Sequence, residues 1–260
     1  MAPNTITFNI VLSAWARCAD RFHDAPKKAE DLLKLQLELV ETNVLRERAD
    51  SLSFAAVILA YARSNDPAKT QNAYRLLRTM LAAIADGTVL SGTNPAVAFT
   101  NVLNAAVFSR TASVDKNDAD SDPEDDNSSP INTSGFDTGE NEADNAYTIA
   151  LQTYRELKED SFRLGCKPDH MAFAAMLNVV REYTDESSTE RSQMVQLVFE
   201  DACAAGEVSR VVIRALERAS PDKEFLGSLL KNEELREGMI RSSDELPGAW
   251  TRNVGRKFRK

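Results

Sequence analysis

The sequence predicts an all-α fold in which antiparallel helix pairs stack into an α-solenoid. Three observations predict it. Apolar residues recur every three or four positions along most of the chain, strand-like alternation is weak, and a segment of about 45 residues recurs four times. The 260-residue chain is 43% apolar and 27% charged, an ordinary composition for a protein with a sizeable core.

Each repeat begins with a predicted helix that carries a phenylalanine near its start. In each case a small or hydroxyl residue precedes the phenylalanine and an apolar pair follows it, within residues 7–17, 53–63, 98–108 and 172–182. The intervals between these phenylalanines are 46, 45 and 74 residues. The last interval falls to 43 when the 31 residues 115–145 are set aside, so we expect that stretch to interrupt the third repeat. The phenylalanines are Phe8, Phe54, Phe99 and Phe173.

A second helix is predicted in each of the first three repeats. Its marker is an alanine about 20 residues after the phenylalanine, because a small residue at a helix crossing lets two helices approach closely. Large residues four and seven positions later lie on the same helical face and are expected to fill the groove between neighbours. The three sets are Ala29, Leu33 and Gln36; Ala73, Leu77 and Met80; and Ala150, Tyr154 and Leu157.

Other helix starts are predicted where a capping side chain precedes a proline. Asp66-Pro67, Asn94-Pro95 and Ser220-Pro221 have this pattern. They place helix starts at the second helix of repeat two, the first helix of repeat three and the C-terminal region.

The negative charge of the chain is concentrated in residues 115–145. This segment contains eleven carboxylates and one base, Lys116, a net charge of −10, whereas the whole chain carries −9. It lacks apolar periodicity, so we expect a disordered acidic insert. The predicted organisation is therefore helical repeats over 3–114, the insert over 115–145, further repeats over 146–206, and capping helices with a basic tail over 207–260.

The same composition excludes several classes of protein. No apolar run reaches the roughly 18–20 residues of a membrane helix, and MAPNTITFN has no features of a secretory signal. Three scattered cysteines indicate reduced thiols, not a disulfide framework, and two histidines do not make a His-rich metal site. No glycine-rich phosphate-binding motif is present. We expect neither a cofactor nor a metal.

The third and fourth repeats carry the most specific sequence pattern. ALQTYREL at 150–157 leads into GCKPD at 165–169 and HMAF at 170–173. These residues resemble the second helix, the turn and the next first helix of the pentatricopeptide repeat, and PNTITFN at 3–9 is similar to the junction between two such repeats. The resemblance covers residues 3–114 and 146–206 and implies a right-handed superhelix, similar to that of tetratricopeptide repeats.

The chain departs from the pentatricopeptide pattern in two ways. Its repeats are about ten residues longer than those of the family, with the excess in the turns. Pro3-Asn4 matches the last two positions of a preceding repeat. We therefore expect that the sequence begins inside a longer array.

The resemblance implies a non-catalytic protein that binds single-stranded RNA in a mitochondrion or plastid, where it takes part in RNA processing, stability or translation. Family members read a base with the fifth residue of the first helix and the last residue of the repeat. By position these pairs are Asn9 with Asp50, Ala55 with Asn94 or Pro95, and Thr100 with Asp169. The first pair implies uracil and the third implies guanine. Ala55 has no hydrogen-bonding side chain.

Each of these residues also has a simpler explanation. Asp50, Asn94 and Asp169 are suitable N-caps for the helices that follow them, and Asn9 and Thr100 are also compatible with solvated polar positions. Two sets of basic side chains are candidates for contact with RNA phosphates. One is the tail, with Arg252, Arg256, Lys257, Arg259 and Lys260; the other is scattered on the repeats, namely Arg17, Arg46, Arg48, Arg63, Arg75, Arg78, Arg155, Arg163 and Lys167.

The same residues bear on two other functions. A protein–protein scaffold is the alternative, in which the solenoid groove holds a peptide or a partner helix. Catalysis by Cys166 and His170 is disfavoured, because the two residues flank a proline-containing turn and are explained as ordinary repeat residues. Two readable repeats contribute only about 2–6 kcal/mol, against association costs of about 4–15 kcal/mol, so RNA binding by this chain is expected to be weak.

Overall fold

The computed structural model describes residues 3–92, 94–117, 138–230 and 246–255. Within these ranges the secondary structure is helical, and the β-pairing is an isolated bridge between Asp50 and Leu90. The prediction of an all-α fold is confirmed. The helices are α1 (Thr5–Cys18), α2 (Ala25–Glu41), α3 (Ser51–Arg63), α4 (Lys69–Ala85), α5 (Ala96–Asn117), α6 (Thr138–Lys158), α7 (His170–Tyr183), α8 (Thr189–Ala205), α9 (Arg210–Ala219) and α10 (Lys223–Leu230).

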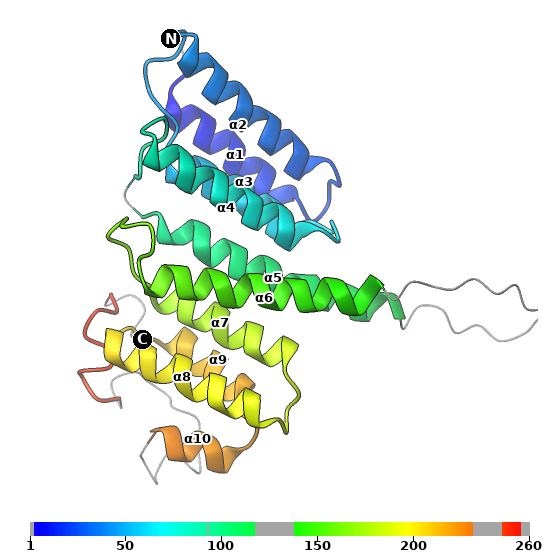
Figure 1. Ribbon diagram of the computed structural model, residues 1–260, viewed down its shortest axis with the longest axis vertical. Helices are drawn as coiled ribbons and strands as arrows, with labels where there is room; N and C mark the ends of the chain where they lie inside the picture. The colour runs from blue at the N-terminus through cyan, green and yellow to red at the C-terminus, as the bar shows by residue number, and fades with distance from the viewer. Residues whose placement is uncertain (1–2, 93, 118–137, 231–245, 256–260) are drawn as a thin grey trace, which may run out of the picture.

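The helices form two layers along the length of the molecule. The odd-numbered helices α1, α3, α5, α7 and α9 pack side by side in chain order. Each of the first four also packs against the even-numbered helix that follows it, and α2, α4, α6 and α8 lie along the other side (Figure 1). Short connections join α1 to α2 (residues 19–24), α3 to α4 (residues 64–68) and α7 to α8 (residues 184–188).

The predicted repeat positions form the core. Phe8 is nearly buried, and the other three repeat phenylalanines are fully buried. The alanines predicted at helix crossings, Ala29, Ala73 and Ala150, have no exposed surface. The residues four and seven positions after them are also buried, so the sequence predicts the packing faces of both helix types correctly.

Side-chain caps start the first helices of three repeats. Asn4 and Thr7 form a capping box at α1, and Asp50 and Ser53 form the equivalent box at α3. At α7 the Asp169 carboxylate accepts from two backbone N–H groups. Such bonds satisfy amide donors that an isolated helix start leaves unpaired.

Some predicted boundaries differ from the structure. Helix α4 begins at Lys69, where Asp66 accepts from the Ala68 N–H, and α10 is preceded by Asp222, which accepts from the Phe225 N–H. The hydroxyl of Ser220 instead donates to the Leu216 carbonyl at the end of α9, so Ser220 does not cap α10.

The ends of the predicted acidic insert are helical. Helix α5 continues through residues 115–117 and α6 begins at Thr138. The interior of the predicted insert, residues 118–137, lies outside the described residues. The described helices therefore extend into the predicted insert at both of its ends, which apolar periodicity does not indicate.

The C-terminal segment packs back on α8. The Trp250 carbonyl accepts from the Val208 N–H at 2.8 Å, and the Trp250 ring meets Phe199 edge to face at a centroid distance of 5.6 Å. Helices α9 and α10 also lie in this region, which the sequence predicts as closing helices.

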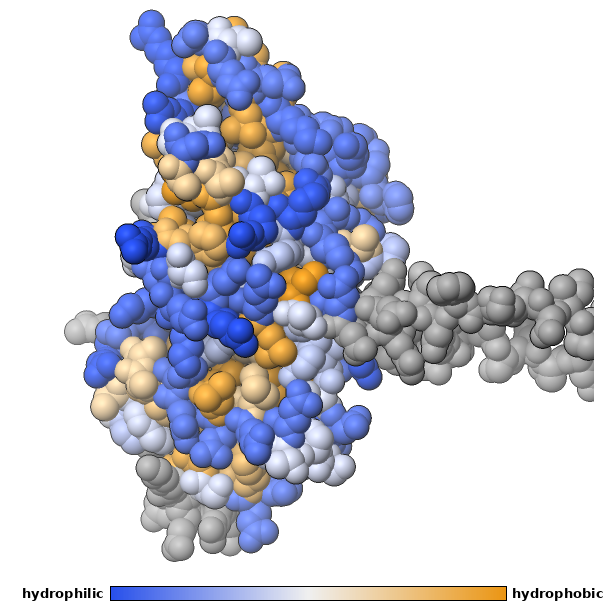
Figure 2. Space-filling view, in the orientation of Figure 1, coloured by the Kyte–Doolittle hydropathy of each residue, from blue (hydrophilic) through white to orange (hydrophobic). Residues whose placement is uncertain are grey.

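Polar residues dominate the surface, but apolar side chains interrupt it. In the view of Figure 2 they gather along one edge of the upper half, which is built from the N-terminal helices. The most exposed large apolar side chains of the described residues include Ile6 (66%) and Ile10 (65%) of α1.

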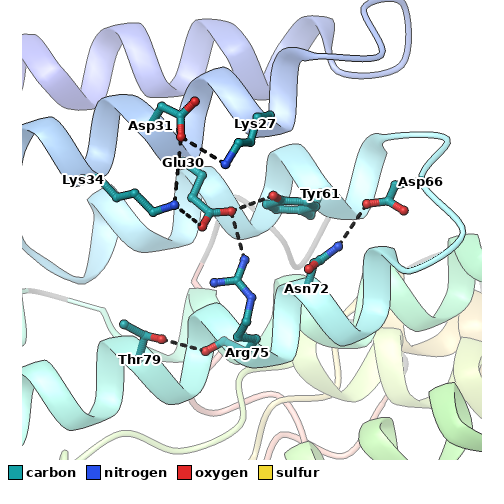
Figure 3. A network of polar contacts seen from close by, with 9 residues as sticks. All are labelled: Lys27, Glu30, Asp31, Lys34, Tyr61, Asp66, Asn72, Arg75 and Thr79. Carbon is teal, nitrogen blue, oxygen red and sulfur yellow. Dashed lines mark hydrogen bonds and ion pairs between the residues drawn. The ribbon is translucent and has the colours of Figure 1, made fainter.

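A buried carboxylate links three of the N-terminal helices (Figure 3). Glu30 on α2 accepts a hydrogen bond from the Tyr61 hydroxyl of α3 at 2.6 Å and forms ion pairs with Arg75 of α4 and Lys34 of α2, both at 2.9 Å. This network joins the first helix pair to the second through directional contacts.

Candidate functional site

A groove with a volume of about 800 Å³ lies between α1 and the start of α3. Its walls come from α1, from the segment that leads into α3, and from Leu90 of the segment after α4. Backbone hydrogen bonds from Leu90 to Ala49 and from Ser51 to Leu90 hold the two segments together, at 2.9 and 3.1 Å. The groove therefore forms where equivalent turns of successive repeats meet.

Asn9 and Asp50 lie together in this groove. The Asn9 Nδ2 group donates to Asp50 Oδ1 at 3.2 Å, and the Ser53 hydroxyl donates to Asn9 Oδ1 at 2.7 Å. Asp50 Oδ1 also accepts from the Ser53 backbone N–H at 3.0 Å, which is its capping bond. Capping and contact with Asn9 thus use the same oxygen.

This arrangement leaves polar atoms available for a ligand. Among the described residues, every hydrogen bond of the Asp50 carboxylate uses Oδ1, so Oδ2 is free to accept. Asn9 has a second Nδ2 hydrogen beside it. The pair therefore presents one acceptor next to one donor, held in place by Ser53.

Aliphatic side chains flank this polar pair. Ile6 lies one helical turn before Asn9, and Leu52 holds the corresponding position in the second repeat. Both side chains line the groove, as do Ile10 and Leu90, and all four are exposed. The groove therefore suits a planar group whose faces contact these aliphatic side chains and whose polar edge bonds to Asn9 and Asp50.

Three arginines supply positive charge to the groove. Arg17, Arg46 and Arg48 line it and are exposed, and the guanidinium of Arg48 donates to the Gly87 carbonyl at 2.8 Å. Glu47 and Asp50 offset two of the three charges. The groove therefore attracts anions through local guanidinium groups and carries only a small net charge.

The second predicted pair does not come together. Ala55 is buried, and its carbonyl accepts a hydrogen bond from Asn101 Nδ2 of α5 at 2.9 Å. Asn94 is exposed before α5, and its neighbour Pro95 is buried. The methyl group of Ala55 is thus used in packing.

The third predicted pair is also separate. Thr100 is buried, and its hydroxyl donates to the Ala96 carbonyl of its own helix at 3.2 Å. Asp169 is half-buried, and its Oδ1 accepts from the N–H groups of Met171 and Ala172. Asp169 therefore acts as the N-cap of α7, and the Thr100 hydroxyl bonds within its own helix.

The basic candidates divide into several groups. Arg252 donates to the Ala204 carbonyl at 2.7 Å and packs its stem over Gly206, so it holds the C-terminal segment on α8. Arg75 pairs with Glu30, and Arg78 pairs with Glu156. Four others are exposed, namely Arg63, Arg155, Arg163 and Lys167. Four residues of the predicted tail, Arg256, Lys257, Arg259 and Lys260, lie outside the described residues.

The surroundings of Cys166 and His170 do not activate a nucleophile. Burial raises the pKa of the Cys166 thiol to about 11, so it is protonated near neutral pH. The ring of His170 lies 3.7 Å from the Glu207 carboxylate, and that contact raises the pKa of the imidazole. In the described part of the chain, no group of three or more His, Cys, Asp or Glu side chains is arranged to hold a metal ion.

The aliphatic walls are the part of this groove that sequence reasoning missed. A signal was available, because the residue two positions before each repeat phenylalanine is apolar in all four repeats: Ile6, Leu52, Val97 and Met171. Three of these four, namely Ile6, Leu52 and Met171, are exposed in the structure, although the other apolar residues of α3 and α7 are mostly buried. Apolar residues that recur at exposed positions indicate a second apolar surface on the first helices, besides the face that packs in the core.

Comparison of the chain with family models, with curated protein sequences and with solved structures finds no match. Among the described residues, no helix is both long enough and apolar enough to cross a membrane.

Proposed function

We propose that this chain is an α-solenoid, similar to pentatricopeptide repeat proteins, that binds single-stranded RNA without catalysing a reaction. The stacking of consecutive helix pairs in two layers supports the solenoid architecture. A role in RNA processing, stability or translation in a mitochondrion or plastid is part of the proposal through the resemblance of the sequence.

The observation that carries the proposal is the Asn9–Asp50 pair between exposed aliphatic side chains. Unstacked bases are recognised through their hydrogen-bonding edges while their faces lie against side chains. The edge of uracil presents the N3–H donor beside carbonyl acceptors. In this proposal Asp50 Oδ2 accepts from N3–H, the second Nδ2 hydrogen of Asn9 donates to a carbonyl, and Ile6 and Leu52 contact the base faces.

Phosphate contacts complete the proposed site. In this proposal Arg17, Arg46 and Arg48, which line the same groove, neutralise phosphates on either side of the bound base. For single-stranded nucleic acid, three such contacts predict that log Kobs falls with log salt concentration at a slope of about −2. The Asn9–Asp50 pair is the one predicted base-reading pair whose side chains are in contact, so weak binding is expected.

Replacement of the free acceptor tests the proposal. Asp50→Asn keeps an oxygen for the α3 cap and places an amide donor against uracil N3–H, so affinity for a uridine decamer is expected to fall about tenfold. The measurement is fluorescence anisotropy at low ionic strength. Asp169→Asn makes the same change at the α7 cap and is expected to leave RNA affinity unchanged.

Binding to adenosine and cytidine decamers separates base reading from general weakening. The Asp50→Asn variant is expected to bind bases with a ring-nitrogen acceptor better, relative to uridine, than the wild type does. Equal affinity of wild type and Asp50→Asn for every decamer would contradict the proposal.

A protein partner is the second candidate. Exposure of Ile6 and Ile10 favours it, because exposed aliphatic side chains one turn apart on one helix are suited to contact a partner peptide or helix. Absence of salt-dependent RNA binding at low ionic strength would leave this candidate in place of the first.

A further inference from the structure

Helix α9 is built like the first helices of the four repeats. Its N-cap is Ser209, whose hydroxyl accepts from a backbone N–H, as the side chains of Asn4 and Asp50 do at α1 and α3. Four residues after its cap α9 carries the buried Ile213, at the position that Phe8 holds after Asn4. Helix α9 also packs beside α7 as α3 packs beside α1 (Figure 1). Counting from the caps therefore relates each residue of α9 to one of α1 and one of α3.

The same positions are buried in α9 and in α3. Val212, Leu216 and Ala219 have no exposed surface, and neither do the equivalent residues at positions 53, 57 and 60. Helix α9 is therefore turned about its axis in the same way as α3. Its positions 210, 211, 214 and 218 correspond to four residues of α1 that line the groove, namely Thr5, Ile6, Asn9 and Ser13.

Three of these four positions of α9 are arginines. Arg210, Arg214 and Arg218 are exposed, and we call them the α9 arginine stripe. In the part of the chain that the structure describes, none of the three forms an ion pair or a side-chain hydrogen bond. The equivalent positions of α3, α5 and α7 carry neither lysine nor arginine: they are Ser51, Ala55 and Leu59; Ala96, Thr100 and Asn104; and His170, Ala174 and Asn178.

The α9 arginine stripe is suited to an anion that carries several charges. Like charges one helical turn apart repel each other, and no ion pair joins the stripe to Glu217, the carboxylate of the same helix. Each guanidinium group can donate two parallel hydrogen bonds to a phosphate. A chain of linked phosphates therefore relieves the repulsion and uses donors that the fold leaves unused.

We propose that the α9 arginine stripe binds consecutive backbone phosphates of the RNA strand whose base lies between Asn9 and Asp50. The inference rests on the proposed function, because one strand has to follow the first helices from α1 to α9. Neighbouring helices lie about 8–10 Å apart, so these four steps span about 32–40 Å. A stacked strand advances about 3.4 Å per nucleotide and covers this span with about 10–12 nucleotides. Arg214, at the position of Asn9, then contacts phosphate and not a base edge.

The salt dependence of RNA binding tests the stripe. Three groove arginines and three stripe arginines predict that log Kobs for a uridine hexadecamer falls with log salt concentration at a slope of about −4. The double variant Arg214→Gln/Arg218→Gln removes two phosphate contacts and is expected to reduce the slope to about −3. Its affinity is expected to fall equally for uridine, adenosine and cytidine hexadecamers. Arg214→Lys/Arg218→Lys keeps both charges and is expected to keep the wild-type slope.

A matched double variant controls for the loss of positive charge. Lys27 and Lys28 are exposed on α2, in the other layer of helices, and pair with Asp31 and Asp24. Lys27→Gln/Lys28→Gln removes the same charge from the chain and is expected to keep the wild-type slope. All four substituted positions are exposed, so the far-ultraviolet circular dichroism of both double variants is expected to match that of the wild type.

The outcomes separate this inference from the proposed function. If Asp50→Asn weakens RNA binding but Arg214→Gln/Arg218→Gln keeps the wild-type slope, the stripe proposal is wrong and the groove keeps its role. A loss of affinity confined to one of the three hexadecamers would show base contact and overturn phosphate binding. The proposal is also overturned if a glutamate hexadecamer binds as tightly as the RNA and loses affinity equally in the variant, because the stripe then serves an acidic peptide. A wild type that binds no RNA contradicts both proposals.

Discussion

Glu30 shows how one buried carboxylate supports the N-terminal helices. Its side chain is 6% exposed, and burial alone raises the pKa of a carboxyl group. Hydrogen bonds from Tyr61, Lys34 and Arg75 outweigh burial and lower the pKa of Glu30 to about 2, from an ordinary value of 4.5. Burial and the bond to Glu30 raise the pKa of Tyr61, so that hydroxyl stays a donor.

The lowered pKa of Glu30 predicts acid sensitivity. A carboxylate with a lower pKa in the folded than in the unfolded state stabilises the fold fully above the unfolded pKa, and this contribution is lost as the pH falls from about 4.5 to about 2. The shift corresponds to about 3 kcal/mol. Glu30→Ala is expected to lower the free energy of unfolding at pH 7 by about 3 kcal/mol and to flatten its decline between pH 4.5 and pH 2.

Urea denaturation at several pH values measures this effect. Asp31→Ala is the matched control, because Asp31 is the next residue on α2 and pairs with Lys27 at 3.3 Å on an exposed surface. Exposed pairs contribute less than about 1 kcal/mol. If the two variants lost the same stability and kept the same pH dependence, the buried network would have no special role.

At the scale of the helix, the second helices repeat one packing face with one exception. Met80 of α4 and Leu157 of α6 are apolar, but α2 has Gln36 at the equivalent position. Gln36 has no exposed surface, and neither Oε1 nor Nε2 has a hydrogen-bond partner among the described residues. An unpaired buried amide is destabilising by about 1–3 kcal/mol.

Gln36→Met is therefore expected to stabilise the protein. The substitution gives α2 the residue that α4 carries and keeps nearly the same side-chain length, so the free energy of unfolding is expected to rise by about 1 kcal/mol. Met80→Gln is the reverse exchange on α4 and is expected to destabilise. Thermal unfolding of both variants checks the pair, and a destabilised Gln36→Met would show that the amide has a partner that the helix face needs.

The helices and their buried faces were predictable because repeated phenylalanines and alanines mark local contacts. The pairing of Asn9 with Asp50 was implied by the resemblance to the pentatricopeptide repeat, and the two side chains are in contact. Burial of Thr100 and the partners of Glu30 were not predictable, because both depend on which neighbouring helix covers the position. The exposure of Val11 has the same origin, because its counterpart Val57 is buried and, among the described residues, α1 packs only against α2 and α3 in the larger helix–helix contacts.

At the scale of the whole molecule, the net charge of −9 does not describe the groove. Residues 115–145 carry −10, so the remaining chain is close to neutral, and three arginines gather around Asn9 and Asp50. Under the proposed function, electrostatic attraction of RNA is then local and modest. Base contact, and not overall charge, has to distinguish RNA sequences in this account.

Nuclear magnetic resonance of the Asn9 side-chain amide tests the central claim most directly. Titration of the labelled wild-type protein with a uridine oligonucleotide at low ionic strength is expected to shift the Asn9 Nδ2 resonances in a saturable manner. The same titration of Asp50→Asn is expected to give much smaller shifts, whereas Asp169→Asn behaves as wild type. Unchanged Asn9 resonances at saturating RNA would contradict a base-binding role for this groove.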